Sequence, residues 1–528
     1  MIDNVRSSLG EWKAARELLS SALQSYLATC NSLTAACTRP ARTLPERNAA
    51  EDALVVVDSE LGTLSSEIQS LHASHLSMCA LRNRSGRLTR INVLPPEVLR
   101  QIFLLSTIQC VRNIRAKGFY NTLSQVDMYW RQVALNTPEL WTHVDVSPAT
   151  PTRSFYELSR VVLERSREEM VHLHVYEPRK SSFGGPTPDV EIHTLKTFLV
   201  PFITRVASLN LETETSSTYL VHSVMRLWGK IGTAMIRDLS VSLPTDGHSY
   251  YLDIPSGRST QGVSSTHLRT LHVKNISLNW DSEACQNLVD LRLHGPGDLA
   301  SRMDLKMLAM MLAASPRLRV LKLYEKDITR WGDQVVPSIV LEHLEVLNLV
   351  KLEADTLKLI LPLVDQPNPL SHLSVGLTFY DELTEEYRAF FSRCHVSTLY
   401  LESPAEHLSL PCLPTSLSHL IIFQSDLSQP PFIRDSLADS RPRAIVYVTL
   451  VSCVVTLEGL VSLVAETGAQ VLNLDCCLTD RLMDLEGIVN GVCDETRSEL
   501  VEVYPGLICD VSEVDTTAGM ACRTMFDD

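Results

Sequence analysis

Glycine and proline are scarce in this sequence, and so is positive charge. The 21 glycines and 26 prolines among 528 residues are too few for a collagen-like or low-complexity chain. The formal net charge is -15. Because nucleic-acid binding depends on lysine and arginine neutralising phosphates, we expect no nucleic-acid partner. No apolar run reaches the ~18 residues of a membrane-spanning helix, so we expect no membrane partner either. The 45% of apolar residues is enough for a large folded core.

The sequence also lacks the motifs of common enzymes. It contains no glycine-rich phosphate loop, no G-x-S-x-G, no H-E-x-x-H and no C-x-x-C. His72 and His75 are interpreted as surface or seam positions of a helix, and the Cys394–His395 pair as part of a core. The 13 cysteines are scattered and lie mostly in apolar segments, as in a reduced cytoplasmic or nuclear protein. We therefore expect no enzyme, no catalytic residue, no metal and no cofactor.

Residues 1–85 are predicted to be helical. One apolar side is formed by Val5, Leu9, Trp12, Leu19, Leu23 and Tyr26. After the stretch TRPARTLPERN, steps of three and four residues give a heptad seam at Leu54, Val57, Leu61, Leu64, Ile68, Leu71, His75 and Met78. Two alternatives remain open: a helical hairpin that closes on itself, or a coiled coil that joins two copies in a homodimer.

Residues 92–146 are predicted to form a small domain of three short helices. The segment LPPEVLRQIF begins with prolines, which suit a first helical turn. A second helix carries Leu123, Val126, Trp130 and Val133, and TPELW follows it. A core of about 50 residues is thin, so its apolar face needs a partner or a neighbouring domain.

Beyond a predicted linker at 147–160, a short pattern of apolar residues recurs at residues 161–493. Examples are LRTLHV, LVDLRL, LRVLKL and LEVLNL, with amphipathic segments between the copies. The spacing is that of leucine-rich repeats, in which strands and helices alternate to form a solenoid. The central residues are Leu173, Leu209, Leu239, Leu271, Leu291, Leu321, Leu347, Leu373, Leu399, Leu420, Val448 and Leu474. Residues 494–528 are interpreted as an acidic cap and tail. The predicted fold class is α/β, with a helical N-terminal region followed by an irregular solenoid.

LPPEVLRQIF followed by VDMYWRQVALNTPELWTHVDV resembles the F-box of fungal F-box/leucine-rich-repeat proteins, and LERSREEMVHLHV resembles their passage into the repeats. This resemblance implies a non-catalytic subunit of a cullin–RING ubiquitin ligase, which binds the Skp-type adaptor through its F-box and an unidentified target through its repeats. The implied adaptor-binding residues are Leu94, Pro95, Val98, Leu99, Ile102, Phe103, Val126 and Trp130.

One departure from this family lies just before Trp130. Asp127, Met128 and Tyr129 stand where the family usually has a cysteine and a basic pair. An acidic side chain at a contact surface costs binding energy unless it is paired.

A target-binding strip is predicted from the polar residues between the repeat leucines. In a strand, alternate residues point to opposite faces, so these side chains should share one surface. They are His272, Lys274, Arg292, His294, Lys322 and Tyr324. Such cations would recognise an acidic or phosphorylated segment, although a merely solvated face is the alternative. Ile421 and Phe423 are a second, apolar choice.

Two functions therefore remain: a ubiquitin-ligase substrate adaptor, or a leucine-rich-repeat scaffold without ligase association. They differ in whether the face of Val98, Leu99, Ile102 and Phe103 is free.

Overall fold

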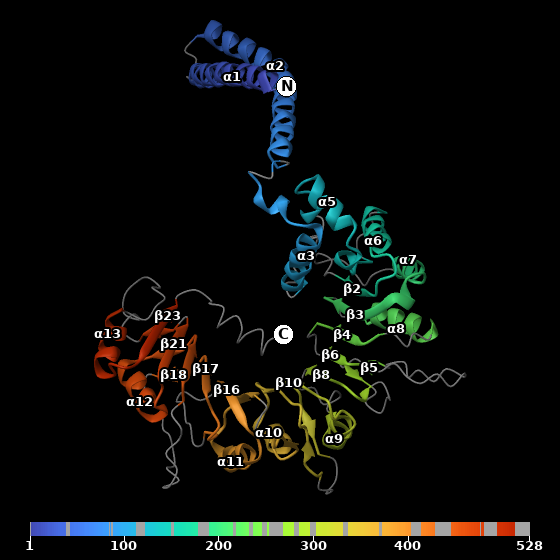
Figure 1. Cartoon of the computed structure of the whole chain (residues 1–528), viewed down its shortest axis with the longest axis vertical. Helices are drawn as coiled ribbons and strands as arrows, with labels where there is room; N and C mark the ends of the chain where they lie inside the picture. Colours follow the sequence, from blue (N-terminus) through green and yellow to red (C-terminus); the bar gives the residue numbers. More distant parts are fainter. Residues whose placement is uncertain are drawn as a thin grey trace. The chain divides into compact units, whose positions relative to one another are not determined.

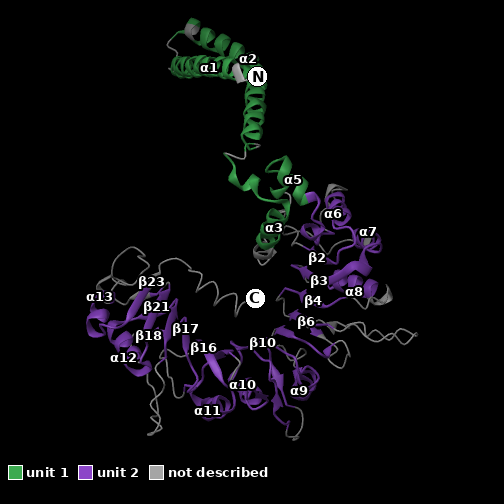
Figure 2. Cartoon of the chain, viewed as in Figure 1, with its two compact units in different colours: residues 1–134 green, residues 135–528 purple. Residues whose placement is uncertain are grey.

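The computed structural model divides the chain into two units, residues 1–134 and 135–528 (Figures 1 and 2). Each unit is described by itself. The structure describes residues 2–38, 43–83, 85, 88–111, 122–148, 153–177, 189–214, 218–231, 236–244, 251–252, 268–278, 285–295, 303–330, 336–368, 372–402, 413–427, 445–475, 477–479 and 494–512.

Unit 1 is helical, as the sequence predicts. Its elements are α1 (Ile2–Cys37), α2 (Leu44–Asn83), the 3-10 helix η1 (Arg90–Val93), α3 (Pro96–Val111) and most of α5 (Met128–Leu135). The predicted continuous heptad helix is present, since α2 contains the whole seam. Among the described residues, no helix has both the length and the apolar character needed to cross a membrane.

Unit 2 is built on one parallel sheet of fourteen strands whose spatial order follows the chain. The strands are β1 (His143–Val146), β2 (Val171–Glu177), β3 (Val206–Thr213), β4 (Asp238–Ser242), β6 (Thr270–Lys274), β8 (Asp290–His294), β10 (Val320–Tyr324), β13 (Val346–Leu349), β15 (Leu373–Thr378), β16 (Val396–Glu402), β17 (His419–Phe423), β19 (Tyr447–Val451), β21 (Val471–Asp475) and β23 (Ile508–Ser512). Each strand pairs in parallel with the next one in this order, so a connection crosses from the end of each strand back to the start of its neighbour.

Helices and short strands connect the main strands. In Figure 1 the helices of unit 2 lie along one side of the row of strands. They are η2 (Pro138–Trp141), α6 (Arg153–Arg165), α7 (Asp189–Leu199), η3 (Ile203–Arg205), α8 (Tyr219–Ile231), α9 (Leu305–Ala313), α10 (Ala354–Ile360), η6 (Asp381–Leu383), α11 (Thr384–Arg393), α12 (Leu457–Thr467) and α13 (Asp494–Val503). The short strands are β5 (Tyr251–Leu252), β7 (Ser277–Leu278), β9 (Met303–Asp304), β11 (Ile328–Thr329), β12 (Ile339–Val340), β14 (Val364–Asp365), β18 (Asp426–Leu427), β20 (Val454–Val455) and β22 (Leu478–Thr479).

Two predicted boundaries are wrong. Residues 153–160 belong to α6 rather than to a linker. The prolines and threonines of the predicted linker lie before residue 153, and the helix that follows them is held because α6 buries Ser159 and Val162 and contacts β1. The strand series also starts earlier and ends later than 161–493, since β1 and β23 are its outermost members.

The predicted central residues lie on adjacent parallel strands and are buried. Leu271, Leu291, Leu321 and Leu347 are direct register partners along β6, β8, β10 and β13. Two positions are displaced: Val375, not Leu373, pairs with Leu347, and Leu472, not Leu474, pairs with Val448. Because side chains alternate with a period of two, this shift leaves Leu373 and Leu474 on the buried face.

The strand ends share one backbone feature. After five of the main strands, one residue at an equivalent position has a positive φ. These residues are Asn275, Glu325, Lys351, Gln424 and Ser452. None of these residues is a glycine, and only one is an asparagine, which adopts this region more readily than most other residues. A left-handed residue turns the chain out of the strand direction, and the same turn is thus repeated after β6, β10, β13, β17 and β19.

Buried thiols tie neighbouring turns together. The Cys453 thiol lies 3.4 Å from the Ile422 carbonyl oxygen, and the Cys477 thiol lies 3.4 Å from that of Leu450. Each thiol thus reaches back to the preceding main strand. The eight cysteines among the described residues form no disulfide, and five of them are buried, which is typical of reduced cysteines in a core.

Candidate functional site

The first candidate surface is a stripe on α3. Val98, Ile102 and Leu105 are 45%, 36% and 56% exposed, respectively. Their spacing of four and three residues places them on one side of the helix. Pro96 starts this helix, where its missing N–H is not needed.

The residues that alternate with this stripe hold α3 in unit 1. Leu99 and Phe103 are almost fully buried, and the Phe103 ring lies 5.0 Å from the Trp130 ring of α5. The prediction that all four apolar residues of α3 are available to a partner is therefore wrong for Leu99 and Phe103. The spacing of apolar residues alone does not separate these two faces, because α3 is apolar on both.

A polar network joins the segment before α3 to α5. The Asn92 side-chain oxygen accepts the Trp130 indole N–H at 2.8 Å, and its amide donates to Asp127 at 2.7 Å and to the Asn83 carbonyl at 2.6 Å. The Tyr129 hydroxyl donates to the Leu94 carbonyl at 2.7 Å. Asn92 was not singled out from the sequence, and its only signal there is its place just before LPPEVL.

Asp127 is a helix cap. Its Oδ1 accepts the backbone N–H of Trp130 at 2.8 Å, three residues into α5, while Oδ2 accepts from Asn92. Capping bonds of this kind stabilise a helix by typically ~1 kcal/mol. The concern that Asp127 is an uncompensated charge at a contact surface is thereby removed.

The remaining predicted adaptor-binding residues surround this network. Pro95 and Val126 are exposed, whereas Leu94 and Trp130 are half-buried. Val126 and Met128 add exposed apolar area at the start of α5.

The second candidate surface is the sheet face opposite the central leucines, which we call the open face. His272, Arg292 and Lys322 are consecutive register partners there, as are Lys274, His294 and Tyr324. Neighbouring strands lie ~4.8 Å apart, so these six residues form two adjacent ladders. The structure thus brings together all the residues predicted for the target-binding strip.

Two acidic residues partly neutralise this strip. Asp290 receives the Arg292 guanidinium at 3.0 and 2.9 Å, and the His272 ring nitrogen lies 3.3 Å away. Burial alone would raise the pKa of Asp290, but the hydrogen bonds and charges of His272 and Arg292 hold it below its ordinary value. Glu325 lies 3.5 Å from His294. The guanidinium of Arg292 is therefore already engaged by Asp290.

The cations differ in their exposure. Lys322 is buried, whereas Lys274 is exposed. The exposed Lys351 adds a further charge next to the strip, with its Nζ 5.2 Å from the centre of the Tyr324 ring. Burial and the charge of Lys274 lower the pKa of His294, so this imidazole is mostly neutral at pH 7. The exposed positive charge of the strip comes from Lys274 and Lys351.

Further along the open face the character changes from charged to apolar. Val350, Tyr400, Ile421 and Val451 form a buried cluster against which Phe423 packs. The interpretation of Ile421 as an exposed apolar residue is wrong, since it is 2% exposed.

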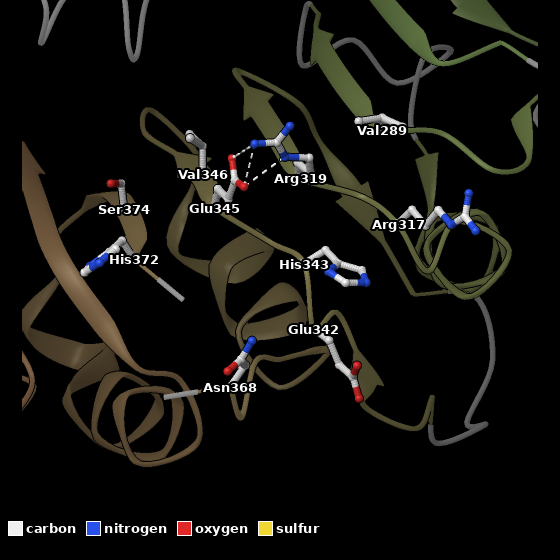
Figure 3. A pocket seen from close by; sticks show the side chains of 10 residues that line it. All are labelled: Val289, Arg317, Arg319, Glu342, His343, Glu345, Val346, Asn368, His372 and Ser374. Atoms are coloured by element: carbon white, nitrogen blue, oxygen red, sulfur yellow. Dashed lines mark hydrogen bonds and ion pairs between the residues drawn. The ribbon is translucent and has the colours of Figure 1, made fainter. Parts of the chain in front are cut away.

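A cavity of about 780 Å³ lies at the edge where β10, β13 and β15 begin (Figure 3). The Arg319 fork and the Glu345 carboxylate face each other across it at 2.9 and 2.8 Å. Arg317, His343 and Glu342 also line it. Arg319 and Glu345 neutralise each other in its lining.

Of the chemical groups considered in the sequence, Cys394 is buried in the core, whereas the two histidines of α2 are exposed. Burial raises the pKa of the Cys394 thiol to about 12, which disfavours the thiolate that a nucleophile needs. His72 and His75 are exposed on α2. Within the part of the chain that the structure describes, no cluster of histidine, cysteine or acidic residues could hold a metal ion.

No protein-family model matches this chain, and no curated protein matches it either.

Proposed function

We propose that this protein is an F-box/leucine-rich-repeat substrate adaptor of a cullin–RING ubiquitin ligase, active in the cytoplasm or nucleus and without catalytic activity of its own. The observation that carries this proposal is the exposed stripe of Val98, Ile102 and Leu105 above a buried row of Leu99 and Phe103. A helix anchored on one side and apolar on the other is suited to receiving a partner.

The sheet supports the repeat part of the proposal. Fourteen parallel strands in chain order, with a recurring left-handed turn and connecting helices, are what stacked leucine-rich repeats would produce. Such an array would offer its open face to a target. The cationic strip there favours an acidic or phosphorylated segment.

The experiment is capture of the Skp-type adaptor by the full-length protein. Val98→Asp combined with Ile102→Asp should abolish capture, because both charges would enter an apolar interface. Gln101→Asp, on a neighbouring exposed position of α3, is the matched control and should retain it. Since neither variant removes a fully buried side chain, circular dichroism should stay unchanged for both. Equal adaptor capture by the double variant and the control would refute the assignment.

A second candidate is a repeat scaffold without ligase association. It is favoured by the breadth of the open face, which could hold a partner without any adaptor. If wild-type protein captures no adaptor but retains a partner through the open face, this candidate replaces the first.

A further inference from the structure

The two N-terminal helices carry 18 of the 34 exposed large apolar residues of the described chain, although they make up only 76 of its residues. Helices of 36 and 40 residues extend over ~54 and ~60 Å. The exposed large apolar residues on α1 and α2 are Val5, Leu9, Trp12, Leu18, Leu19, Leu23, Tyr26, Leu27, Leu33, Leu54, Val55, Val56, Leu61, Ile68, Leu71, Leu76, Met78 and Leu81. Exposed apolar side chains in this number on two helices are typical of an interaction surface.

Most of the exposed apolar residues of α1 lie on one side of the helix. Alternating steps of four and three residues define one seam, which runs through Val5, Leu9, Trp12, Arg16, Leu19, Leu23, Tyr26, Cys30, Leu33 and Cys37. Nine of its ten positions are apolar or cysteine, and Arg16 is the exception. In a coiled coil, side chains at this spacing insert as knobs into holes between the side chains of a second helix. The seam of α2 has the same spacing, so one chain carries two such seams.

The hairpin does not close these seams. Figure 1 shows α1 and α2 side by side. A hydrogen bond with Cys30 raises the pKa of the Tyr26 hydroxyl, and the charges of Glu67 and Glu60 on α2 add to the effect. Yet Tyr26 itself remains about half exposed, as do Leu23 and Leu61. Contact with one helix on one flank leaves such residues half exposed, and a second layer would cover the other flank.

We propose that the seam of α1, supplemented by that of α2, binds the same seams of a second copy of this chain, forming a helical bundle of two hairpins. A second copy is the occupant because it brings seams with an identical heptad spacing and length, and a two-fold interface is self-complementary. Charge favours α1 as the centre of this contact. Within α1 three cations (Arg6, Lys13 and Arg16) balance three acids (Asp3, Glu11 and Glu17), so 3 − 3 = 0, whereas α2 carries two cations and six acids, so 2 − 6 = −4. A stable interface takes about 20–30 residues per partner, of which the two seams supply 18 positions and their flanking residues the rest.

Adjacent leucines of α1 give a matched test. Leu19 lies on the seam, whereas Leu18 is its neighbour off the seam and is 73% exposed. The full-length protein is examined by size-exclusion chromatography with light scattering at micromolar concentration. We expect wild-type protein at twice the mass of the chain. Leu19→Glu with Leu23→Glu should halve that mass, and Leu18→Glu with Leu27→Glu should leave it unchanged.

The alternative outcomes are distinct. A wild-type monomer would overturn the proposal and indicate a different protein as the occupant of the seams. Dissociation by both double variants would show that general apolar association, not the seam, holds the dimer. Circular dichroism of the variants controls for loss of helix: a seam variant that dissociates with its helix content intact supports the proposal. If the glutamate variant loses its helix, the variant Leu19→Ala with Leu23→Ala is used in its place. We expect this alanine variant to raise the dimer dissociation constant tenfold or more.

Discussion

The indole N–H of Trp130 donates to the side-chain oxygen of Asn92 at 2.8 Å, across 38 residues of sequence. The same asparagine donates to Asp127, which caps the helix that carries Trp130. One side chain therefore sets the position of η1 and of α5 together. Because η1 leads directly into α3, this bond fixes the base from which the exposed stripe of α3 is presented.

Asn92→Ala should consequently loosen unit 1. It removes the acceptor of Trp130 Nε1 and the amide partner of Asp127, and leaving such half-buried groups unpaired costs ~1–3 kcal/mol. We expect faster amide hydrogen exchange in α5, measured by mass spectrometry on the full-length protein. Gln132→Ala, an exposed position of the same helix, is the control and should exchange like wild type. Equal protection of the α5 amides in Asn92→Ala and Gln132→Ala would show that the network does not stabilise α5.

His174 should make stability depend on pH at the start of the sheet. Its ring nitrogens lie 2.8 Å from Asp145 and 3.3 Å from Glu212. Burial lowers the pKa of His174, but hydrogen bonds and charges from Asp145 and Glu212 outweigh this effect and raise the pKa to about 9. A pKa raised by folding adds stability that is fully present below the unfolded value of ~6.5 and is lost as pH rises through about 9.

The measurement is urea unfolding of wild type and His174→Asn between pH 6 and pH 10. We expect wild type to lose roughly 2 kcal/mol more than the variant over this range, after discounting for the partly exposed carboxylates. All other titrating groups are common to both proteins, so the difference between the two stability curves reports His174 alone. Parallel stability curves for the two proteins would contradict the role of this ion pair.

Two glycines should respond oppositely to alanine. A Cβ on Gly459, in the first turn of α12, would lie 2.0 Å from the Leu427 carbonyl oxygen, whereas one on Gly62 in α2 meets nothing within 4 Å. Gly459→Ala must displace backbone, so we expect a loss of about 3 kcal/mol or more. Gly62→Ala should be neutral or stabilise by ~0.5–1 kcal/mol, since alanine favours helix. Thermal unfolding of both variants checks this, and an unchanged midpoint for Gly459→Ala would be incompatible with the tight packing of α12 on β18.

The cationic strip yields a prediction that depends on the proposed function. Arg292→Gln should remove the full charge that neutralises Asp290 and leave this carboxylate with His272, which makes the strip more negative and weakens binding of an acidic target about tenfold or more. Asp290→Asn should strengthen the same binding, because it frees the guanidinium. The control is Arg226→Gln, an exposed arginine on α8. Affinities are measured at two salt concentrations, because screening of exposed charges should reduce wild-type binding. Identical affinities for Arg292→Gln and Asp290→Asn would exclude the strip as the target site.

Local spacing in the sequence was enough to predict the central strands of the sheet and the long helix α2, but not α6 or the outermost strands. The recurrence of Leu271, Leu291, Leu321 and Leu347 predicted neighbouring buried strands because a strand alternates its faces with a period of two. The same alternation brought His272, Arg292 and Lys322 to one surface. Steps of three and four residues likewise predicted the long helix α2.

Only the tertiary structure decided which of these groups are available. Leu99 and Val98 are adjacent and both apolar, yet packing within unit 1 buries Leu99 and leaves Val98 exposed. Asp290 occupies Arg292, and Asn92 engages Asp127, through contacts that strand register and chain path create. Residue type and spacing specify which face a side chain occupies, whereas burial and pairing depend on what lies across from it, and that is decided only when distant segments meet.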